Sequence, residues 1–210
     1  FDRINEYGTK LGLHIEHYII SAGMEEIISG TSIRKHFKDV FGCSYVYDKD
    51  GLPIWPARVV NYSTKTQYIA KINKGLSKTE DRAVNEYMPD DQRRIPYKRM
   101  IYFGDGETDV PCMRTVKSNG GYSVAVYGNE RKREQAQQLL AEGRVNFACE
   151  ADIYLEPIPE VFRLIKATED IQNVIPEDKN YDLFICLDCG DAMRLGFSAP
   201  LFENAKETLQ

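Results

Sequence analysis

One short stretch decides how this chain folds, residues 100–109 (MIYFGDGETD). Its first part, MIYF, is an apolar run with the length of a buried β-strand, and Gly104 closes it. The turn that follows carries Asp105 and Asp109, and its glycines let the backbone bring both carboxylates toward one point. Such oxygen ligands suit Mg²⁺, which takes one or two protein carboxylates and keeps several waters. The stretch therefore predicts a strand whose carboxyl end holds a cation.

Helix and strand patterns alternate around this stretch. Helices are predicted over residues 1–10, 24–37, 64–73, 110–117 and 130–142, and strands over residues 13–20, 100–103 and 123–126. Residues 44–47 and 54–60 flank an Asp-Gly pair at residues 50–51, which predicts a hairpin. Strands separated by helices indicate a parallel sheet in a three-layer α/β arrangement. Ligands of such sheets bind beyond the carboxyl ends of the strands, where Ser21 and Asp105 fall.

Three further segments carry a family resemblance. They are residues 17–24 (HYIISAGM), residues 61–67 (NYSTKTQ) and residues 120–127 (GGYSVAVY). In this order with residues 104–109, they resemble the haloacid dehalogenase (HAD) superfamily of phosphatases, in its phosphoserine-phosphatase-like branch, over about residues 1–152. The resemblance implies a three-layer α/β/α, Rossmann-like sheet. It also implies a Mg²⁺-dependent hydrolase that cleaves a small phosphomonoester through an aspartyl-phosphate.

The resemblance also implies a role for each matched residue. Ser21 would donate a hydrogen bond to a phosphoryl oxygen, with Gly23 beside it at the substrate, and Lys65 would supply a fixed positive charge. Asp105 would bind the cation, with Asp109 as a second ligand or as its support. These residues are our candidates for catalysis, substrate binding and metal binding.

Simpler interpretations of the same residues stay open at this point. Ser21 and Asp109 could cap helices, and Lys65 could be a surface lysine. Lys74 is a rival for the role of the lysine.

The nucleophile of the family has no counterpart ahead of Ser21. In the HAD superfamily it is an Asp in an Asp-x-Asp motif that ends the first sheet strand. Asp2 is the sole aspartate of residues 1–13, and it falls in a predicted helix. We therefore expect a HAD-like core that is incomplete at its N-terminus, binds its cation weakly and turns over little or nothing alone.

The C-terminal part carries a different resemblance. Residues 181–196 (YDLFICLDCGDAMRLG) are similar to the second motif of the DHH phosphoesterases, manganese enzymes that cleave phosphodiesters and short oligonucleotides. By this resemblance Asp188 would be a metal ligand, with Mn²⁺ as the cation and a short oligonucleotide as substrate. The Asp-His-His motif of that family is absent. We expect two units in a chimeric chain, a HAD-like core over residues 1–152 and a partial DHH-like α/β segment over residues 153–210.

Composition limits the possible functions further. A net charge of −5 and a pI near 5.4 argue against binding nucleic acid by bulk charge. The sequence has neither an apolar run of membrane-spanning length nor a signal-peptide pattern, so we expect no membrane partner and a cytoplasmic location. The 5 cysteines are odd in number and scattered, which predicts reduced thiols. The basic residues 131–133 are expected on a solvated helix face.

Three functional hypotheses follow. The first is a HAD-type phosphatase acting on a small phosphorylated substrate. The second is a DHH-type phosphodiesterase, and the third is a non-catalytic module that binds phosphorylated ligands or a protein partner.

Overall fold

The computed structural model describes residues 1–79 and 82–151 and the backbone of residues 182–187. The strands of this part are β1 (His14–Met24), β2 (Phe37–Tyr47), β3 (Pro53–Arg58), β4 (Met100–Gly104), β5 (Tyr122–Tyr127), β6 (Phe147–Glu150) and β7 (Asp182–Leu187). The α-helices are α1 (Asp2–Lys10), α2 (Glu25–Ser29), α3 (Lys65–Lys74), α4 (Val110–Ser118) and α5 (Glu130–Ala141). Short 3₁₀ turns are η1 (Ser32–His36), η2 (Ala83–Asn85), η3 (Asp90–Gln92), η4 (Tyr97–Arg99) and η5 (Glu107–Asp109).

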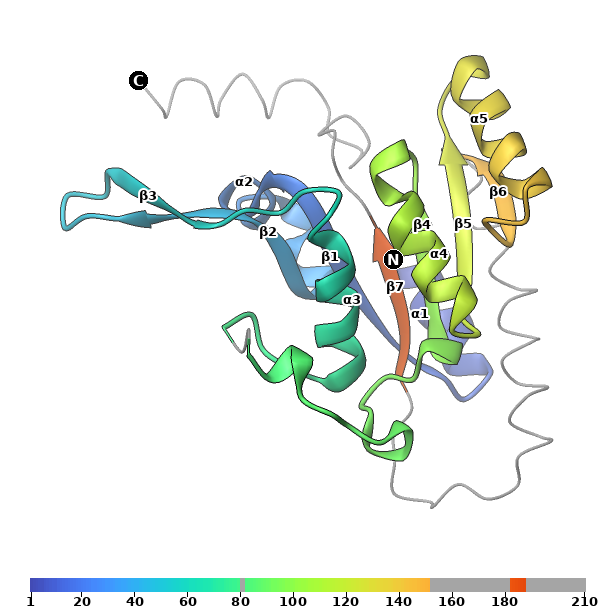
Figure 1. Ribbon diagram of the computed structural model, residues 1–210, viewed down its shortest axis with the longest axis horizontal. Helices are drawn as coiled ribbons and strands as arrows, with labels where there is room; N and C mark the ends of the chain where they lie inside the picture. Colours follow the sequence, from blue (N-terminus) through green and yellow to red (C-terminus); the bar gives the residue numbers. More distant parts are fainter. Residues whose placement is uncertain (80–81, 152–181, 188–210) are drawn as a thin grey trace.

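The described strands form a seven-stranded sheet in the order β3-β2-β1-β7-β4-β5-β6. The neighbouring strands are parallel, apart from the antiparallel pair of β2 and β3. The fold is therefore mixed α/β, as the alternating pattern of the sequence predicts (Figure 1).

Helices cover both faces of the sheet because the buried side chains of the strands alternate. Met100 and Tyr102 of β4 belong to a core cluster that includes residues of α3, α4 and α5. Ile101 and Phe103 belong to a second cluster, with Ile4 of α1. Helices α3, α4 and α5 accordingly lie in front of the sheet and α1 behind it in Figure 1.

Strand β7 brings the C-terminal part of the chain into the middle of this sheet. It pairs in parallel with β1 from His14 to Ile19 and with β4 from Met100 to Phe103. Its last residue, Leu187, lies level with Ile19 and Phe103. Asp188 and the rest of the DHH-like motif after Leu187 lie outside the described residues. The division into two units at about residue 152 stays a prediction.

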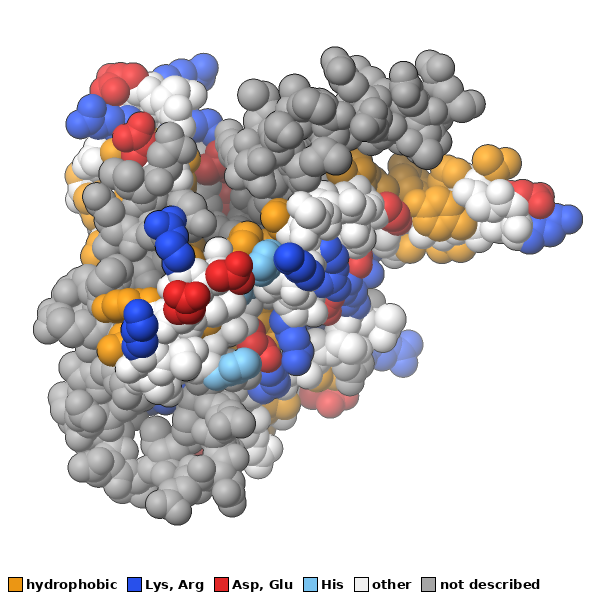
Figure 2. Space-filling model, turned by 180° about the vertical axis from the view of Figure 1, so that it is seen from behind, with side chains coloured by type: hydrophobic (Ala, Val, Ile, Leu, Met, Phe, Trp, Pro, Cys, Tyr) orange, Lys and Arg blue, Asp and Glu red, His pale blue; other side chains and the backbone are white. Residues whose placement is uncertain are grey.

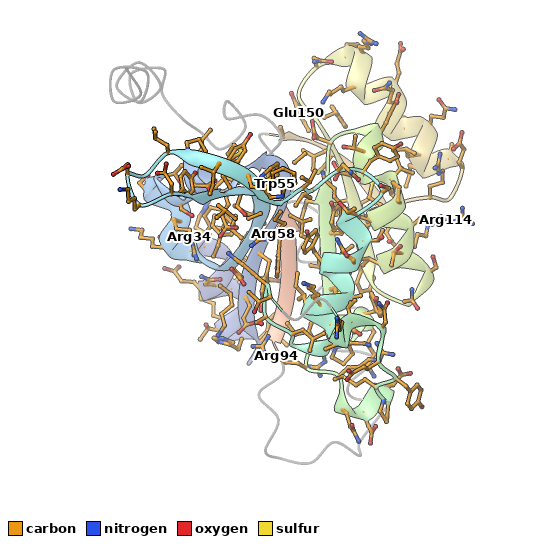
Figure 3. The ribbon with its side chains drawn as sticks, turned by 60° about the vertical axis from the view of Figure 1, so that its left-hand side comes forward. Arg34, Trp55, Arg58, Arg94, Arg114 and Glu150 are labelled. Atoms are coloured by element: carbon orange, nitrogen blue, oxygen red, sulfur yellow. The ribbon has the colours of Figure 1, made fainter. Side chains whose placement is uncertain are left out.

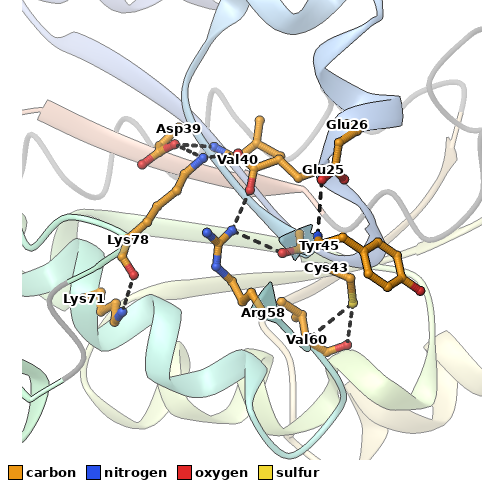
Figure 4. Close-up of polar contacts among 11 residues, drawn as sticks. Glu25, Glu26, Asp39, Val40, Cys43, Tyr45, Arg58, Val60, Lys71 and Lys78 are labelled. Carbon is orange, nitrogen blue, oxygen red and sulfur yellow. Dashed lines mark hydrogen bonds and ion pairs between the residues drawn. The ribbon is translucent and has the colours of Figure 1, made fainter. Parts of the chain in front are cut away.

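The hairpin predicted from the Asp-Gly pair is confirmed. Strands β2 and β3 extend away from the body of the molecule (Figure 1), and Gly51 closes their turn with φ +81°, a conformation that favours glycine. At the base of the hairpin, Arg58 donates hydrogen bonds to Glu25 Oε2 (2.5 Å) and to the carbonyl of Gly42 (3.2 Å) (Figure 4). The hairpin carries exposed apolar side chains, among them Trp55 at 71% exposure, and they form the orange band on the projection in Figure 2.

The helix predicted over residues 24–37 is wrong. Helix α2 ends at Ser29, a 3₁₀ turn follows Thr31, and β2 begins at Phe37. Phe37 and Val40 are buried because β2 pairs with β1, opposite His17 and Ile19. Long-range strand pairing thus overrides a local helical pattern. The other four helices begin and end within two residues of their predicted bounds.

No helix in residues 1–79 and 82–151 is long and apolar enough to cross a membrane.

A polar network joins the beginning of β1 to the loop before β4. Arg94 donates to both carboxylate oxygens of Glu16, at 2.7 and 2.5 Å, and the hydroxyl of Tyr18 donates to Glu16 Oε2 at 2.6 Å. In Figure 3, Arg94 lies at the opposite end of the molecule from Glu150, the last residue of β6. The network therefore stabilises the end of the sheet remote from the carboxyl ends of its strands.

We expect Glu16→Gln to destabilise the protein at neutral pH more than in acid. Burial raises the pKa of Glu16, but the hydrogen bonds from Arg94 and Tyr18 outweigh it and lower the pKa from 4.5 to about 2. A carboxyl with a lowered folded-state pKa stabilises fully above its unfolded pKa of 4.5 and loses that contribution as the pH falls toward 2. The free energy of unfolding should fall by about 2–3 kcal/mol at pH 7 and by less than half of that at about pH 3. Urea unfolding at the two pH values measures the change. Glu6→Gln, at an exposed position, is the control. Equal losses of unfolding free energy at both pH values would contradict the assignment of the lowered pKa to Glu16.

Removing β7 should destabilise the sheet, because β1 and β4 would each lose the hydrogen-bonding partner between them. We expect a chain ending at residue 151 to melt at least about 10 °C below the full chain, since 1 kcal/mol shifts the midpoint by about 2–4 °C at this size. Circular dichroism melts measure the difference. A chain ending at residue 187 keeps β7 and is the control. Equal midpoints for the two truncated chains would show that β7 contributes little to the sheet.

Candidate functional site

A buried ion pair lies at the centre of the candidate site. Lys65, in the first turn of α3, is 1% exposed, and its Nζ donates to Asp109 Oδ1 at 2.9 Å. The hydroxyl of Tyr102, on β4, donates to the same oxygen at 2.8 Å. The pair thus joins α3, the end of η5 and β4. Lys65 is therefore not a surface lysine.

Asp109 occupies the N-cap position of α4, but its side chain makes no capping hydrogen bond. It turns instead toward Lys65 and Tyr102, so the interpretation of Asp109 as a helix cap is wrong. Its side chain is fully buried, and its second oxygen, Oδ2, has no hydrogen-bond partner among the described residues. A buried carboxylate oxygen without a donor is costly, and it offers a ligand position to a cation.

Gly104 makes this arrangement possible. A Cβ at residue 104 would lie 2.5 Å from Asp109 Cβ and 2.6 Å from Met113 Cε. Only glycine therefore lets the turn after β4 fold back so closely that Asp109 packs against the end of the strand.

Asp105 has a different partner from Asp109. Its Oδ2 accepts a bond from Lys132 Nζ at 2.5 Å, and its carbonyl accepts one from the same nitrogen at 3.2 Å. Lys132 lies in the first turn of α5. Both residues line a cavity of about 360 Å³ between the turn after β4 and α5. The expectation that residues 131–133 all lie on a solvated helix face is therefore wrong for Lys132.

Ser21 is fully buried within β1 and is not a helix cap. Its Oγ accepts a hydrogen bond from the N–H of Gly23 at 3.0 Å. The register of β1 against β2 is irregular between Ile20 and Met24, so both residues lie where the strand departs from regular pairing. The N–H of Gly23 is therefore directed at Ser21 Oγ and fixes the position of the hydroxyl.

The rival lysine is occupied elsewhere. Lys74 Nζ donates to the carbonyls of Val84, at 2.7 Å, and of Glu86. Of these two lysines, it is Lys65 that reaches an aspartate of the turn after β4.

Tyr102 and Lys132 belong to the site although the sequence patterns did not predict a role for them. Tyr102 lies in an apolar run, where a buried tyrosine is normal. Only the hydrogen bond from its hydroxyl to Asp109 shows that it belongs to the site. Lys132 could have been found from the topology, because the first turn of a helix that follows a parallel strand lies at the carboxyl end of the sheet.

The donors of the site are compatible with a hard cation. Asp105 and Asp109 provide carboxylate oxygens, which Mg²⁺ prefers. Within residues 1–79 and 82–151, no group of three or more His, Cys, Asp and Glu side chains gathers as a metal site. Two carboxylates alone suit a cation that completes its coordination with water and substrate oxygens.

Comparison with known proteins adds one relative and no activity. No family model and no solved structure matches the chain. An uncharacterized protein of Borreliella burgdorferi is 29% identical over 174 residues, which cover 72% of this chain. The chain spans 58% of the length of that relative.

We expect Lys65→Met to lower the free energy of unfolding by about 3–5 kcal/mol, because it leaves Asp109 charged and buried without a counter-ion. Urea unfolding measures the change. Lys10→Met, at an exposed position in the last turn of α1, is the control and should change stability by less than about 0.5 kcal/mol.

A double variant tests the cause of that loss. Adding Asp109→Leu to Lys65→Met removes the stranded charge, so the double variant should be clearly more stable than the sum of the single changes predicts. Simple additivity would contradict the ion pair as the source of the destabilisation.

Proposed function

We propose that this chain carries the phosphate-binding and cation-binding part of a HAD-type, Mg²⁺-dependent phosphomonoester hydrolase. The observation that carries the proposal is the buried pair of Lys65 and Asp109 at the end of β4, with Tyr102 on the same oxygen. Burying two charges costs desolvation free energy, and well-packed apolar residues at the same positions usually stabilise a protein as much as the ion pair does. Its place beyond a strand end, beside Asp105, favours a role in binding.

Each residue has a definite part in this chemistry. Phosphoryl transfer asks the protein mainly to position the phosphoryl group and to neutralise its charge. The Ser21 hydroxyl, which the N–H of Gly23 holds in place, would donate to a phosphoryl oxygen, and Lys65 would keep a positive charge beside it. Asp105, supported by Asp109, would hold Mg²⁺, which when bound neutralises the phosphate charge.

The arrangement of the strands supports the Rossmann-like HAD sheet as part of the proposal. Ser21 lies near the end of β1 and Asp105 directly after β4, and these parallel strands flank β7. Both candidates thus belong to the same edge of one sheet, the usual ligand edge of α/β folds.

Turnover by these residues alone is expected to be little or none. The reason is that no described residue is assigned as the nucleophile. A module that binds phosphorylated ligands without cleaving them would use the same contacts. A DHH-type manganese phosphodiesterase would instead depend on Asp188, which lies outside the described residues. A cytoplasmic location is part of this proposal.

The proposal predicts Mg²⁺-dependent binding of inorganic phosphate, measured by isothermal titration calorimetry. Ser21→Ala should weaken phosphate binding about tenfold, because one hydrogen bond to a charged group is lost. Ser29→Ala, at an exposed position on α2, is the control. If the protein hydrolyses p-nitrophenyl phosphate, Asp105→Ala should abolish that turnover. If phosphate affinity were the same with and without Mg²⁺ and unchanged by Ser21→Ala, the proposed binding site would be wrong.

A further inference from the structure

Lys132 contacts one of the two carboxylate oxygens of Asp105. Its ammonium contacts both the carboxylate and the carbonyl of Asp105, at 2.5 and 3.2 Å. The side chains of Lys132 and Asp105 are 27% and 13% exposed. The contact is therefore largely withdrawn from water, and it is not one of the loose surface pairs that contribute little.

The backbone holds Lys132 in place for this contact. The side chain of Asn129, the N-cap of α5, accepts a hydrogen bond from the N–H of Lys132 at 3.0 Å. The next residue, Arg133, pairs with Glu130 on the surface, where their side chains are 54% and 76% exposed. Two neighbouring cations of one helix thus have different surroundings, and Lys132 is the one that reaches the turn after β4.

We propose that Lys132 is a tethered counter-ion of Asp105 that competes with the divalent cation and is released when the cation binds. This inference rests on the proposed function. An ammonium and Mg²⁺ seek the same carboxylate oxygen, and two cations in contact with one oxygen repel each other. Mg²⁺ holds its ligand oxygens at about 2.1 Å, so a cation on this oxygen would lie within a few ångströms of the ammonium and be repelled by it.

The cavity beside the pair can accommodate the side chain of Lys132 after its release. It is lined by Lys132 and Asp105 together with polar residues of α5 such as Gln135. Once released, the ammonium stays tethered at this cavity and adds positive charge next to the cation. Lys132 therefore weakens cation binding in the free protein and favours an anion once the cation is bound.

Direct binding of Mn²⁺ tests the competition. Mn²⁺ takes the same oxygen ligands as Mg²⁺, and its free form is counted by electron paramagnetic resonance. We expect Lys132→Met to tighten Mn²⁺ binding about tenfold, because the internal competitor is gone. Arg133→Met removes the same charge one residue away and should tighten it less than about twofold, since exposed charges are screened. Unchanged or weaker Mn²⁺ binding by Lys132→Met would overturn the proposal.

A third variant separates this inference from the proposed function. Asp105→Asn should abolish Mn²⁺ binding in both the parent protein and Lys132→Met. If Mn²⁺ binds equally well without the Asp105 carboxylate, the cation site of the proposed function is wrong. If Asp105→Asn abolishes binding while Lys132→Met changes nothing, only the competition is wrong. Absence of Mn²⁺ binding from every variant would overturn both.

Amine labelling of the unmodified protein provides an independent measurement that does not depend on how a variant folds. Acetylation by acetic anhydride, read by mass spectrometry, should be slow at Lys132 without metal and several-fold faster with saturating Mg²⁺. Labelling of the exposed Lys10 should be the same in both conditions. Equal labelling of Lys132 with and without Mg²⁺ would contradict its release.

Discussion

The ion pair of Lys65 and Asp109 is the constraint on which the candidate site depends. It lies between a helix that follows the hairpin and the turn that follows β4, so it fixes the position of α3 against the sheet edge. Burying two charges costs several kcal/mol for each ion, and the direct contact together with the Tyr102 hydroxyl offsets that cost. If the turn moved away from Lys65, the charges of Asp109 and Lys65 would be left without a partner in an apolar interior. Its backbone is therefore held rigid, and this is what a binding site for a small anion or cation requires.

The local parts of the fold could be predicted from sequence because short-range patterns determine them. The Asp-Gly turn predicts the hairpin, and four of the helices follow from helical periodicity and their ends. The place of β7 could not be predicted in this way, since its pairing with β1 joins residues 14–19 to residues 182–187. The helix expected over residues 24–37 failed for the same reason. Pairing with β1 buries Phe37 and Val40 and stabilises the chain more than a longer helix would. No local sequence pattern contains that information.

Two of the candidate residues, Ser21 and Asp105, were predicted from their place near strand ends. Motif order predicted Lys65 and Asp109 as well, and it assigned both aspartates to the cation. The structure gives them different partners, Lys65 for Asp109 and Lys132 for Asp105. That difference depends on which way each side chain turns after Gly104, and packing decides this rather than composition.

The two aspartates therefore differ in how easily each carboxylate can exchange its positively charged partner. Asp109 is enclosed, and its counter-ion and the Tyr102 hydroxyl are both part of the packed core, so replacing them would require the fold to open. Asp105 lies at the wall of a cavity, and its counter-ion stands on a flexible four-carbon stem that can swing away. In the proposed site, Asp109 would maintain the geometry of the turn, and Asp105 would exchange its partner without disturbing that geometry.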